Sequence, residues 1–474
     1  MVIGTIADTI TRTVEGAGAA VSEAFFEPVI RLGVTGLSRA GKTVFITSLV
    51  ANLLERGRMP QLSAAAEGRI LTAFLQPQPD DTLPRFDYET HLSALMARAP
   101  YWPESTRSVS ELRLSFRLRP GGLLGGLASL GGPRTLHLDI VDYPGEWILD
   151  LVLLDDDYAG WSADTLRRME DRSSAAAYLA QAAEVDPTAK LEEPAAQALA
   201  RGFTAYLNEA RAAGYSDCTP GRFLLPGELA GSPVLTFAPL PDPGNAGRGS
   251  LWREMSRRFE AYKREVAKPF FRDHFARIDR QIVLVDVLGA VHAGPKAVED
   301  LRRTLTDVLT AFQPGSNSFL ATMLGASRVE RILFAATKAD HLHHTQHGRL
   351  TAIMDALVKD ARSRADFAGA QTEALSIAAL RATVEETRTH QGRDLDMVRG
   401  RLLEDGRMAA FYPGDLPQDP SHLLGPAREG ADGWLDADYS IMRFAPAPLT
   451  LRPGEGPPHV RLDRATQFLI GDKL

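Results

Sequence analysis

This 474-residue chain has a single cysteine, no long apolar run and no excess of positive charge. The single cysteine, Cys218, excludes a disulfide framework and a cysteine-based structural zinc site. No stretch approaches the roughly 18 apolar residues of a membrane-spanning helix, and residues 1–30 lack the basic start of a secretory signal. A net charge of −7 argues against a protein that coats nucleic acid. We therefore expect a cytoplasmic protein without a nucleic-acid partner.

The residues that are present predict an α/β protein with more than one folding unit. Strand signals alternate with helical segments, which predicts a mostly parallel sheet with helices on both faces. Two of the strands, 110–119 and 135–142, look like an antiparallel pair joined by a long glycine-rich loop. The remaining expected strands are 29–35, 281–287, 331–337 and 373–377, and the helices between them are 41–55, 295–312 and 350–364.

Apolar residues recur every three or four positions near the start of the chain. This spacing predicts an amphipathic helix over residues 1–28. Such a helix can dock on the protein's own surface or contact a membrane or a partner. The apolar positions are Ile3, Ile6, Ile10 and Val14.

Residues 36–43 read Gly-Leu-Ser-Arg-Ala-Gly-Lys-Thr, which matches the phosphate-loop pattern G-x-x-x-x-G-K-[ST] between an expected strand and helix. In such a loop, backbone N–H groups and the helix N-terminus bind phosphates. Lys42 would neutralise the β- and γ-phosphates, and the Thr43 hydroxyl would ligate Mg²⁺. Arg39 is either a solvent-facing loop residue or an internal arginine finger. The expected nucleotide-binding residues here are Gly36, Ser38, Arg39, Ala40, Gly41, Lys42, Thr43 and Val44.

A D-x-x-G segment, residues 142–145, ends the second strand of the expected antiparallel pair. Asp142 would approach the magnesium ion, and the Gly145 N–H could sense a γ-phosphate. A second D-x-x-G segment starts at Asp286 and also ends a strand. We favour Asp142, because the order of phosphate loop, strand pair and D-x-x-G matches small GTPases, and we expect Asp286 to be structural.

Thr337-Lys338-Ala339-Asp340 resembles the guanine-specificity box N-K-x-D, with threonine in place of asparagine. The Asp340 carboxylate would accept hydrogen bonds from N1 and N2 of guanine, and the Lys338 stem would pack over the base. Ser376 and Ile377 follow the last expected strand and match the weaker box that backs the base. These elements predict a guanine nucleotide, GTP or GDP, as the ligand.

One further magnesium ligand is expected from the loop before residue 110. A threonine that senses Mg²⁺ belongs just ahead of the first strand of the antiparallel pair, so we select Thr106. Thr82 and Thr90 remain alternatives.

Four histidines directly follow the guanine box. His343 and His347 are spaced as metal ligands on one helix face are. No nearby carboxylate completes an obvious site, so we expect a solvated loop without a metal role. The four are His341, His343, His344 and His347.

The motifs together predict a P-loop NTPase fold of the GTPase type, with a large helical insertion and a C-terminal extension. Residues 146–277 are rich in alanine, glutamate and arginine at helical spacing, which indicates the insertion. The two parts of the GTP-binding domain would then be 29–145 and 278–388. Residues 389–474 are loop-rich and are expected to pack on that domain.

The chain resembles the YcjX-like family of bacterial P-loop proteins, a divergent GTPase-like group. This resemblance implies guanine-nucleotide binding with Mg²⁺, a stress-linked role and a possible membrane-protein partner, hence a possible peripheral location at the inner membrane. The shared segments are G-L-S-R-A-G-K-T at 36–43, W-P-E-S-T at 102–106, D-Y-P-G-E-W at 142–147, T-K-A-D at 337–340, K-P-F-F-R-D-H-F at 268–275, S-I-A-A-L-R-A-T at 376–383 and the terminal R-L-D-R-A-T-Q-F-L-I-G-D-K-L.

Glu146 stands where small GTPases place a water-orienting glutamine. A carboxylate cannot donate a hydrogen bond unless it is protonated, so we expect slow hydrolysis. The expected function is a slow Mg²⁺-dependent GTPase that acts as a nucleotide-gated switch. Alternatives are an interaction module with incidental hydrolysis and an ATP-using ATPase or kinase. The expected catalytic residues are Lys42, Thr106, Gly145 and Glu146.

Overall fold

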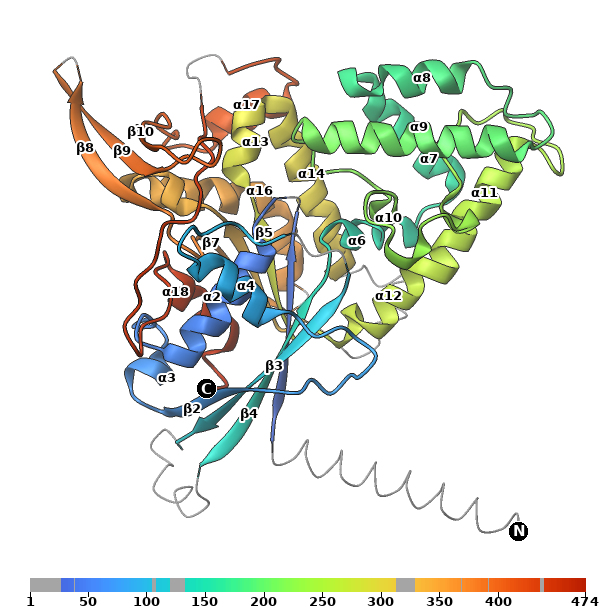
Figure 1. Cartoon of the computed structure of the whole chain (residues 1–474). Helices are drawn as coiled ribbons and strands as arrows, with labels where there is room; N and C mark the ends of the chain where they lie inside the picture. Colours follow the sequence, from blue (N-terminus) through green and yellow to red (C-terminus); the bar gives the residue numbers. More distant parts are fainter. Residues whose placement is uncertain are drawn as a thin grey trace, which may run out of the picture.

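The structure is a computed structural model, shown in Figure 1. It describes residues 27–37, 39–104, 108–119, 133–312, 329–367, 369–390, 392–434 and 439–474. Most of the predicted N-terminal helix over residues 1–28 lies outside these ranges. None of the helices within them is both long and apolar enough to cross a membrane.

A seven-stranded sheet in the order β2-β3-β4-β1-β5-β6-β7 forms the centre of the molecule. The strands β4, β1, β5, β6 and β7 run parallel, and β3 pairs antiparallel with β4, so the predicted α/β fold is confirmed. An additional edge strand, β2, pairs antiparallel with β3 in a region where no strand was predicted. The strands are β1 Val29–Gly36, β2 Ile70–Gln76, β3 Ser110–Leu118, β4 Arg134–Asp142, β5 Arg280–Val285, β6 Arg331–Ala336 and β7 Gln371–Ser376.

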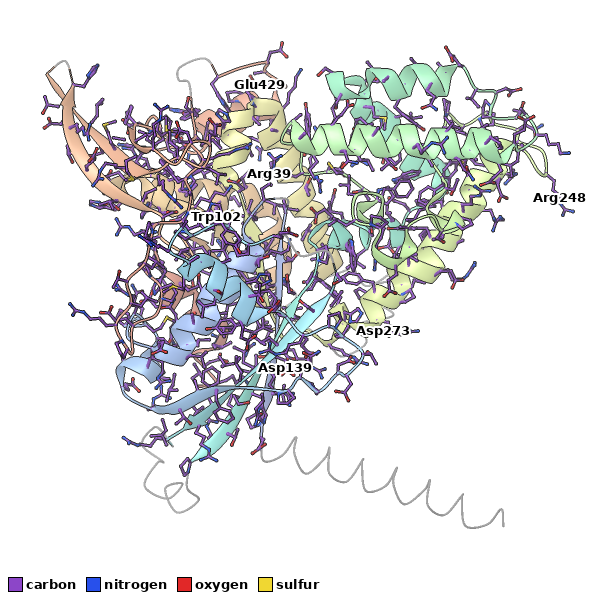
Figure 2. The ribbon with its side chains drawn as sticks, viewed as in Figure 1. Arg39, Trp102, Asp139, Arg248, Asp273 and Glu429 are labelled. Atoms are coloured by element: carbon purple, nitrogen blue, oxygen red, sulfur yellow. The ribbon has the colours of Figure 1, made fainter. Side chains whose placement is uncertain are left out.

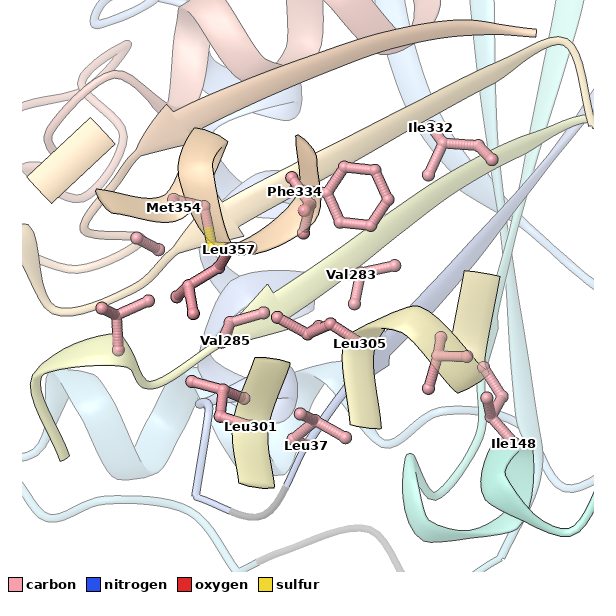
Figure 3. Packing of buried hydrophobic residues seen from close by; sticks show 14 of the residues in the cluster. Leu37, Ile148, Val283, Val285, Leu301, Leu305, Ile332, Phe334, Met354 and Leu357 are labelled. Carbon is pink, nitrogen blue, oxygen red and sulfur yellow. The ribbon is translucent and has the colours of Figure 1, made fainter. Parts of the chain in front are cut away.

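Helices cover both faces of this sheet. Successive residues of a strand point to opposite sides, so the apolar residues of an inner strand pack against helices on both faces. In β5, Ile282 and Leu284 pack with the cluster that includes α2 and α18, whereas Val283 and Val285 join the cluster that includes α14 and α16. Figure 3 shows the second cluster, in which Leu301 of α14 lies among these residues. The covering helices are α2 Lys42–Glu55, α3 Ser63–Ala66, α4 Tyr88–Met96, α13 Val287–Ala293, α14 Pro295–Phe312, α16 His347–Phe367 and α18 Leu462–Ile470, with the short turns η8 Ala339–His341 and η9 His344–Gln346.

Helices of very different length occupy the range 146–277 that was predicted to be an insertion, hereafter the insertion. They enclose their own aromatic core, in which Trp161 stacks on Phe259 with 5.0 Å between ring centroids. The helices are α6 Glu146–Leu149, η2 Val152–Leu154, α7 Tyr158–Glu170, η3 Ser173–Ala175, α8 Ala176–Ala183, α9 Glu193–Ala212, α10 Gly221–Leu224, η4 Gly227–Leu229, η5 Pro233–Leu235, α11 Leu251–Tyr262, η6 Lys263–Ala267, α12 Lys268–Asp273 and η7 Phe275–Arg277.

The region after β7 differs from the loop-rich extension that was expected. It starts with a three-stranded antiparallel sheet, hereafter the ribbon, which projects on the opposite side of the molecule from the insertion (Figure 1). The ribbon begins six residues before the expected boundary at 389. The reason is that β8 and β9 are rich in charged and polar residues and are mostly exposed or half-buried, which gives no regular apolar signal. Its strands are β8 Thr383–His390, β9 Arg393–Arg401 and β10 Met408–Phe411, and α17 Ser421–Arg428 follows.

Candidate nucleotide-binding site

A cavity of about 420 Å³ lies where β1, β5, β6 and β7 end. Ligands of open α/β sheets bind at the carboxyl ends of the parallel strands, and the volume suits a small ligand. The cavity brings together segments that are far apart in the sequence. Its lining consists of Arg39, Ala40, Gly41, Lys42, Thr43, Val44, Phe45, Trp102, Pro103, Leu284, Thr337, Lys338, Asp340, His341, Ile377, Ala378, Ala379, Leu380, Leu403, Arg443 and Phe444.

The phosphate loop lies between β1 and α2, as predicted. Gly41 has φ 83°, which favours glycine, and it directly precedes the first turn of α2. The Lys42 ammonium donates a hydrogen bond to the Gly36 carbonyl at 3.2 Å, so it lies across the loop. Of the expected loop residues, Ser38 lies outside the described ranges.

Arg39 is exposed and lines the cavity, on the same side of the molecule as Trp102 (Figure 2). Its φ of 64° is unusual for a residue with a side chain and costs roughly 1–2 kcal/mol relative to glycine. An exposed side chain at the mouth of the cavity agrees with the solvent-facing role, and it also lets the guanidinium reach an anionic ligand.

Two oxygen-bearing side chains beside the phosphate loop could hold Mg²⁺. The Thr43 hydroxyl donates to the Glu104 carbonyl at 3.3 Å, and Thr43 itself is buried. Asp142, fully buried, ends β4 opposite Val34 of β1. A hydroxyl and a carboxylate suit a hard cation such as Mg²⁺.

The predicted switch threonine, Thr106, lies outside the described residues. The contact between Glu104 and Thr43 nevertheless places the segment just before it against the phosphate loop. The alternatives lie in local turns: the Thr82 hydroxyl donates to Asp80 at 2.5 Å, and the Thr90 amide donates to the helix-capping Asp87 at 3.2 Å.

Gly145 of the D-x-x-G segment packs directly on the phosphate loop. A Cβ at this position would stand 1.9 Å from the Gly36 carbonyl oxygen, so no larger residue fits. The rival Asp286 instead accepts a hydrogen bond from the Gly289 amide at 3.0 Å, which caps α13, and it forms an ion pair with Lys338. These contacts agree with the structural role expected for Asp286.

Glu146 does not line the cavity. Its carboxylate faces the insertion, 3.9 Å from the Arg211 guanidinium, and the residue is buried. A Cβ on Gly221 would lie 2.1 Å from the Glu146 carbonyl oxygen, so α6 and α10 are in close contact. The structure therefore places Glu146 in the first helix of the insertion, against α10 and Arg211.

The other end of the cavity is formed by the T-K-x-D segment after β6. Asp340 is buried, and one of its carboxylate oxygens accepts a hydrogen bond from the Ala382 amide at 2.8 Å. The Asp340 carbonyl accepts another from the Thr383 hydroxyl. Thr337, which replaces the expected asparagine, donates through its hydroxyl to the Val285 carbonyl at 3.3 Å and thereby joins the ends of β6 and β5.

The loop after β7 supports this end of the cavity from behind. The Ser376 hydroxyl does not line the cavity, because it donates to the His347 carbonyl at 2.9 Å and accepts from Arg461 at 2.8 Å. Ile377 lines the cavity, and its amide donates to the Ala336 carbonyl at 2.8 Å. The C-terminal segment thus holds the loop in place through Arg461.

The sequence motifs do not predict several of the lining residues. The Trp102 indole donates to the Phe444 carbonyl at 2.8 Å, and the His341 ring meets the Phe444 ring edge-on at 5.2 Å. Desolvation lowers the pKa of His341, which favours its neutral form. Trp102 lies in the W-P-E-S-T segment of the resemblance, but nothing in the sequence brings Leu403, Arg443 or Phe444 to the site.

The sheet order, the phosphate loop and the facing D-x-x-G segment define a GTPase-like P-loop protein. A sequence model of the YcjX-like family, DUF463, matches residues 30–474, and the chain belongs to this family, as the resemblance indicated. A relative from Escherichia coli named "Ras-like GTPase YcjX" is 38% identical over 458 residues, covering 94% of this chain and 96% of its own length. A relative of the same name from Shewanella oneidensis is 36% identical over 470 residues, covering 94% of each chain.

Proposed function

We propose that this protein binds a guanine nucleotide with Mg²⁺ and hydrolyses GTP slowly as a nucleotide-gated switch. The observation that carries the proposal is the placement of Lys42 and Asp340 in the lining of one cavity. A cation at one end suits phosphates, and a buried carboxylate at the other suits the N1 and N2 donors of guanine. The printed names of both relatives support the same class of activity.

At the phosphate end, the chain's own groups have distinct roles. Lys42, now bonded to the Gly36 carbonyl, would exchange that oxygen for those of the β- and γ-phosphates. Thr43 and Asp142 would hold Mg²⁺, together with Thr106. When bound, Mg²⁺ neutralises phosphate charge. Gly145 lies against the loop and would report the γ-phosphate through its amide.

Slow hydrolysis follows from the environment of Glu146. Its carboxylate points to Arg211 and cannot donate a hydrogen bond to water while it is ionised. This placement also favours the second candidate, an interaction module in which hydrolysis is incidental. The stress-linked role and the membrane-protein partner implied by the family stay predictions.

The test of the base assignment is the variant Asp340→Asn. An asparagine oxygen can still accept the Ala382 amide, so the loop should keep its structure. Guanine loses a charge-assisted pair, which costs about 1.5–3 kcal/mol or roughly ten- to a hundredfold in affinity. Xanthine nucleotides should gain affinity, because xanthine presents a carbonyl where guanine has its amino group.

The matched control is Asp186→Asn, which changes an exposed carboxylate in the insertion. Calorimetric titration of each variant with GTP and XTP gives the two affinities. Equal GTP affinity in Asp340→Asn and in the control would show that the Asp340 carboxylate does not bind the guanine base.

A further inference from the structure

Two histidines next to the nucleotide cavity face carboxylates that the sequence does not place near them. The Glu385 carboxylate, on β8, lies 2.6 Å from His344 Nδ1 and 3.8 Å from His343 Nε2. Ligand atoms of these three residues all lie within 4.8 Å of one another, the one such group among the described residues. The expectation of no metal role rested on the lack of a nearby carboxylate, and that premise was wrong.

The His343 ring is held in one tautomer by a chain of hydrogen bonds. The Thr345 hydroxyl donates its hydrogen to Asp396 on β9 at 3.2 Å, so it can only accept from His343 Nδ1, at 3.0 Å. The Asp396 carboxylate itself is 3.4 Å from the same nitrogen. Nδ1 therefore carries the proton, and the lone pair of Nε2 points toward Glu385.

This arrangement is typical of histidines that ligate metals. The non-ligating ring N–H of such a residue is usually bound by a carboxylate or another acceptor, which fixes the ring and raises its basicity. Ligands about 2.0–2.2 Å from a tetrahedral zinc ion lie roughly 3.3–3.6 Å apart. The observed separations are 2.6 and 3.8 Å, so an ion would replace the hydrogen bond that His344 Nδ1 donates to Glu385, and these two atoms would move apart by roughly 1 Å. His344 is largely exposed and can adjust.

We propose that His343, His344 and Glu385 bind a divalent transition-metal ion of the zinc class, with a fourth position open to water. Two imidazoles favour zinc, nickel or copper over magnesium and calcium, which prefer oxygen ligands. The Arg381 guanidinium, 3.2 Å from the other Glu385 oxygen, fixes that carboxylate in place. Thr345 and Asp396 are positioning residues, because they act through His343.

The metal site lies next to the segments that hold Asp340. His343 follows Asp340 by three residues, and Glu385 follows Ala382 and Thr383, which both bind Asp340. A metal ion bridging the two segments would hold Asp340 in place before the base arrives. This consequence rests on the proposed guanine site, but metal binding itself does not.

The test is a titration of the full chain, free of any affinity tag and of bound metal, with Co²⁺ and then Zn²⁺ in the absence of nucleotide. Intense visible absorption of one Co²⁺ per chain, displaced by one Zn²⁺, is the expected signature of a tetrahedral site with nitrogen ligands. His343→Gln and Glu385→Gln should each weaken binding at least about a hundredfold. Thr345→Val, which leaves every ligand in place, should weaken it about ten- to a hundredfold.

His422→Gln, on α17, is the matched control and should bind as the wild type does. Circular dichroism and the melting temperature of the metal-free variants establish that each is folded. Absence of a saturable Co²⁺ spectrum in the wild type would overturn the proposal. Undiminished binding in folded His343→Gln and Glu385→Gln would also overturn it, because the ion would then sit on other histidines. Neither result depends on whether GTP binds.

Discussion

The insertion and the ribbon flank the central sheet on opposite sides but are built differently (Figure 1). The insertion encloses a large core, whereas the buried part of the ribbon's cluster is small: Ala382, Val398 and Phe444. The ribbon strands are held to one another mainly by backbone pairing and exposed polar pairs. The core of the insertion includes Tyr158, Trp161, Tyr178, Phe203, Phe237, Phe259 and Tyr262.

The two regions are also joined to different ends of the cavity. The insertion meets the phosphate end through α6, where Trp147 packs edge-on against Phe270 and lies beneath the Arg222 guanidinium at 3.2 Å. The ribbon meets the base end through the contacts of Ala382 and Thr383 with Asp340. The insertion has a core of its own and can therefore transmit a movement of α6. The ribbon has little core, so its position depends on the loop around Asp340 to which it is bound.

The largest expected effect is on stability. Phe259→Ala should lower the free energy of unfolding by about 3–5 kcal/mol, because a fully buried ring is lost from the core of the insertion. Val398→Ala, a smaller truncation at a buried position of the ribbon, should cost only about 1–3 kcal/mol. Urea unfolding followed by circular dichroism measures both. Equal costs would contradict the contrast between the two cores.

A second effect concerns the pH dependence of stability where α6 contacts the rest of the insertion. Burial raises the pKa of the Asp150 carboxyl to about 6, although the Tyr262 hydroxyl and the Gly221 amide both donate to it. Between about pH 4 and 6 the folded state therefore holds a proton that the unfolded chain has released. Stability should fall as the pH rises through this window, by about 3 kcal/mol in total.

Asp150→Asn should remove this part of the pH dependence. Asp394→Asn, at an exposed position of the ribbon, is the matched control and should leave the profile unchanged. Urea midpoints of wild type and both variants, measured across the window, give the comparison. The same dependence of the urea midpoint on pH in wild type and in Asp150→Asn would contradict the raised pKa of Asp150.

The smallest expected effect is a response of the insertion to the nucleotide. Gly145 contacts the phosphate loop and α6 follows it at once, so a shift at Gly145 should reach α10 and α12. Hydrogen exchange with GDP and with a non-hydrolysable GTP analogue should differ there by roughly fivefold, or about 1 kcal/mol. The ribbon strand β9 is the internal control. Identical protection of α10 and α12, with both nucleotides bound, would make the insertion a rigid attachment.

The sequence predicted the parts of the fold that carry a strong periodic or glycine signal. The parallel strands, the antiparallel pair and the helix after the phosphate loop could be recognised because their apolar residues are buried on a regular period. The edge strand β2 was not predicted, since most of its residues are only partly buried. The ribbon escaped notice for the same reason.

In the site, the sequence did not predict contacts between residues that lie far apart along the chain. Lys42 and Asp340 could be assigned from local motifs, and both line the cavity. The approach of Glu385 to His343 and of Phe444 to Trp102 depends on how the C-terminal region folds back, which no local pattern encodes. The direction of the Glu146 side chain likewise depends on Arg211, 65 residues later.

The most direct test of the guanine-nucleotide site is the affinity of the wild-type protein for GTP, GDP and ATP, measured side by side with Mg²⁺. The account predicts tight binding of GTP and GDP, at least about tenfold weaker binding of ATP, and loss of all three in Lys42→Ala. Equal or tighter binding of ATP would contradict the role assigned to Asp340, and unchanged binding in folded Lys42→Ala would contradict the phosphate loop itself.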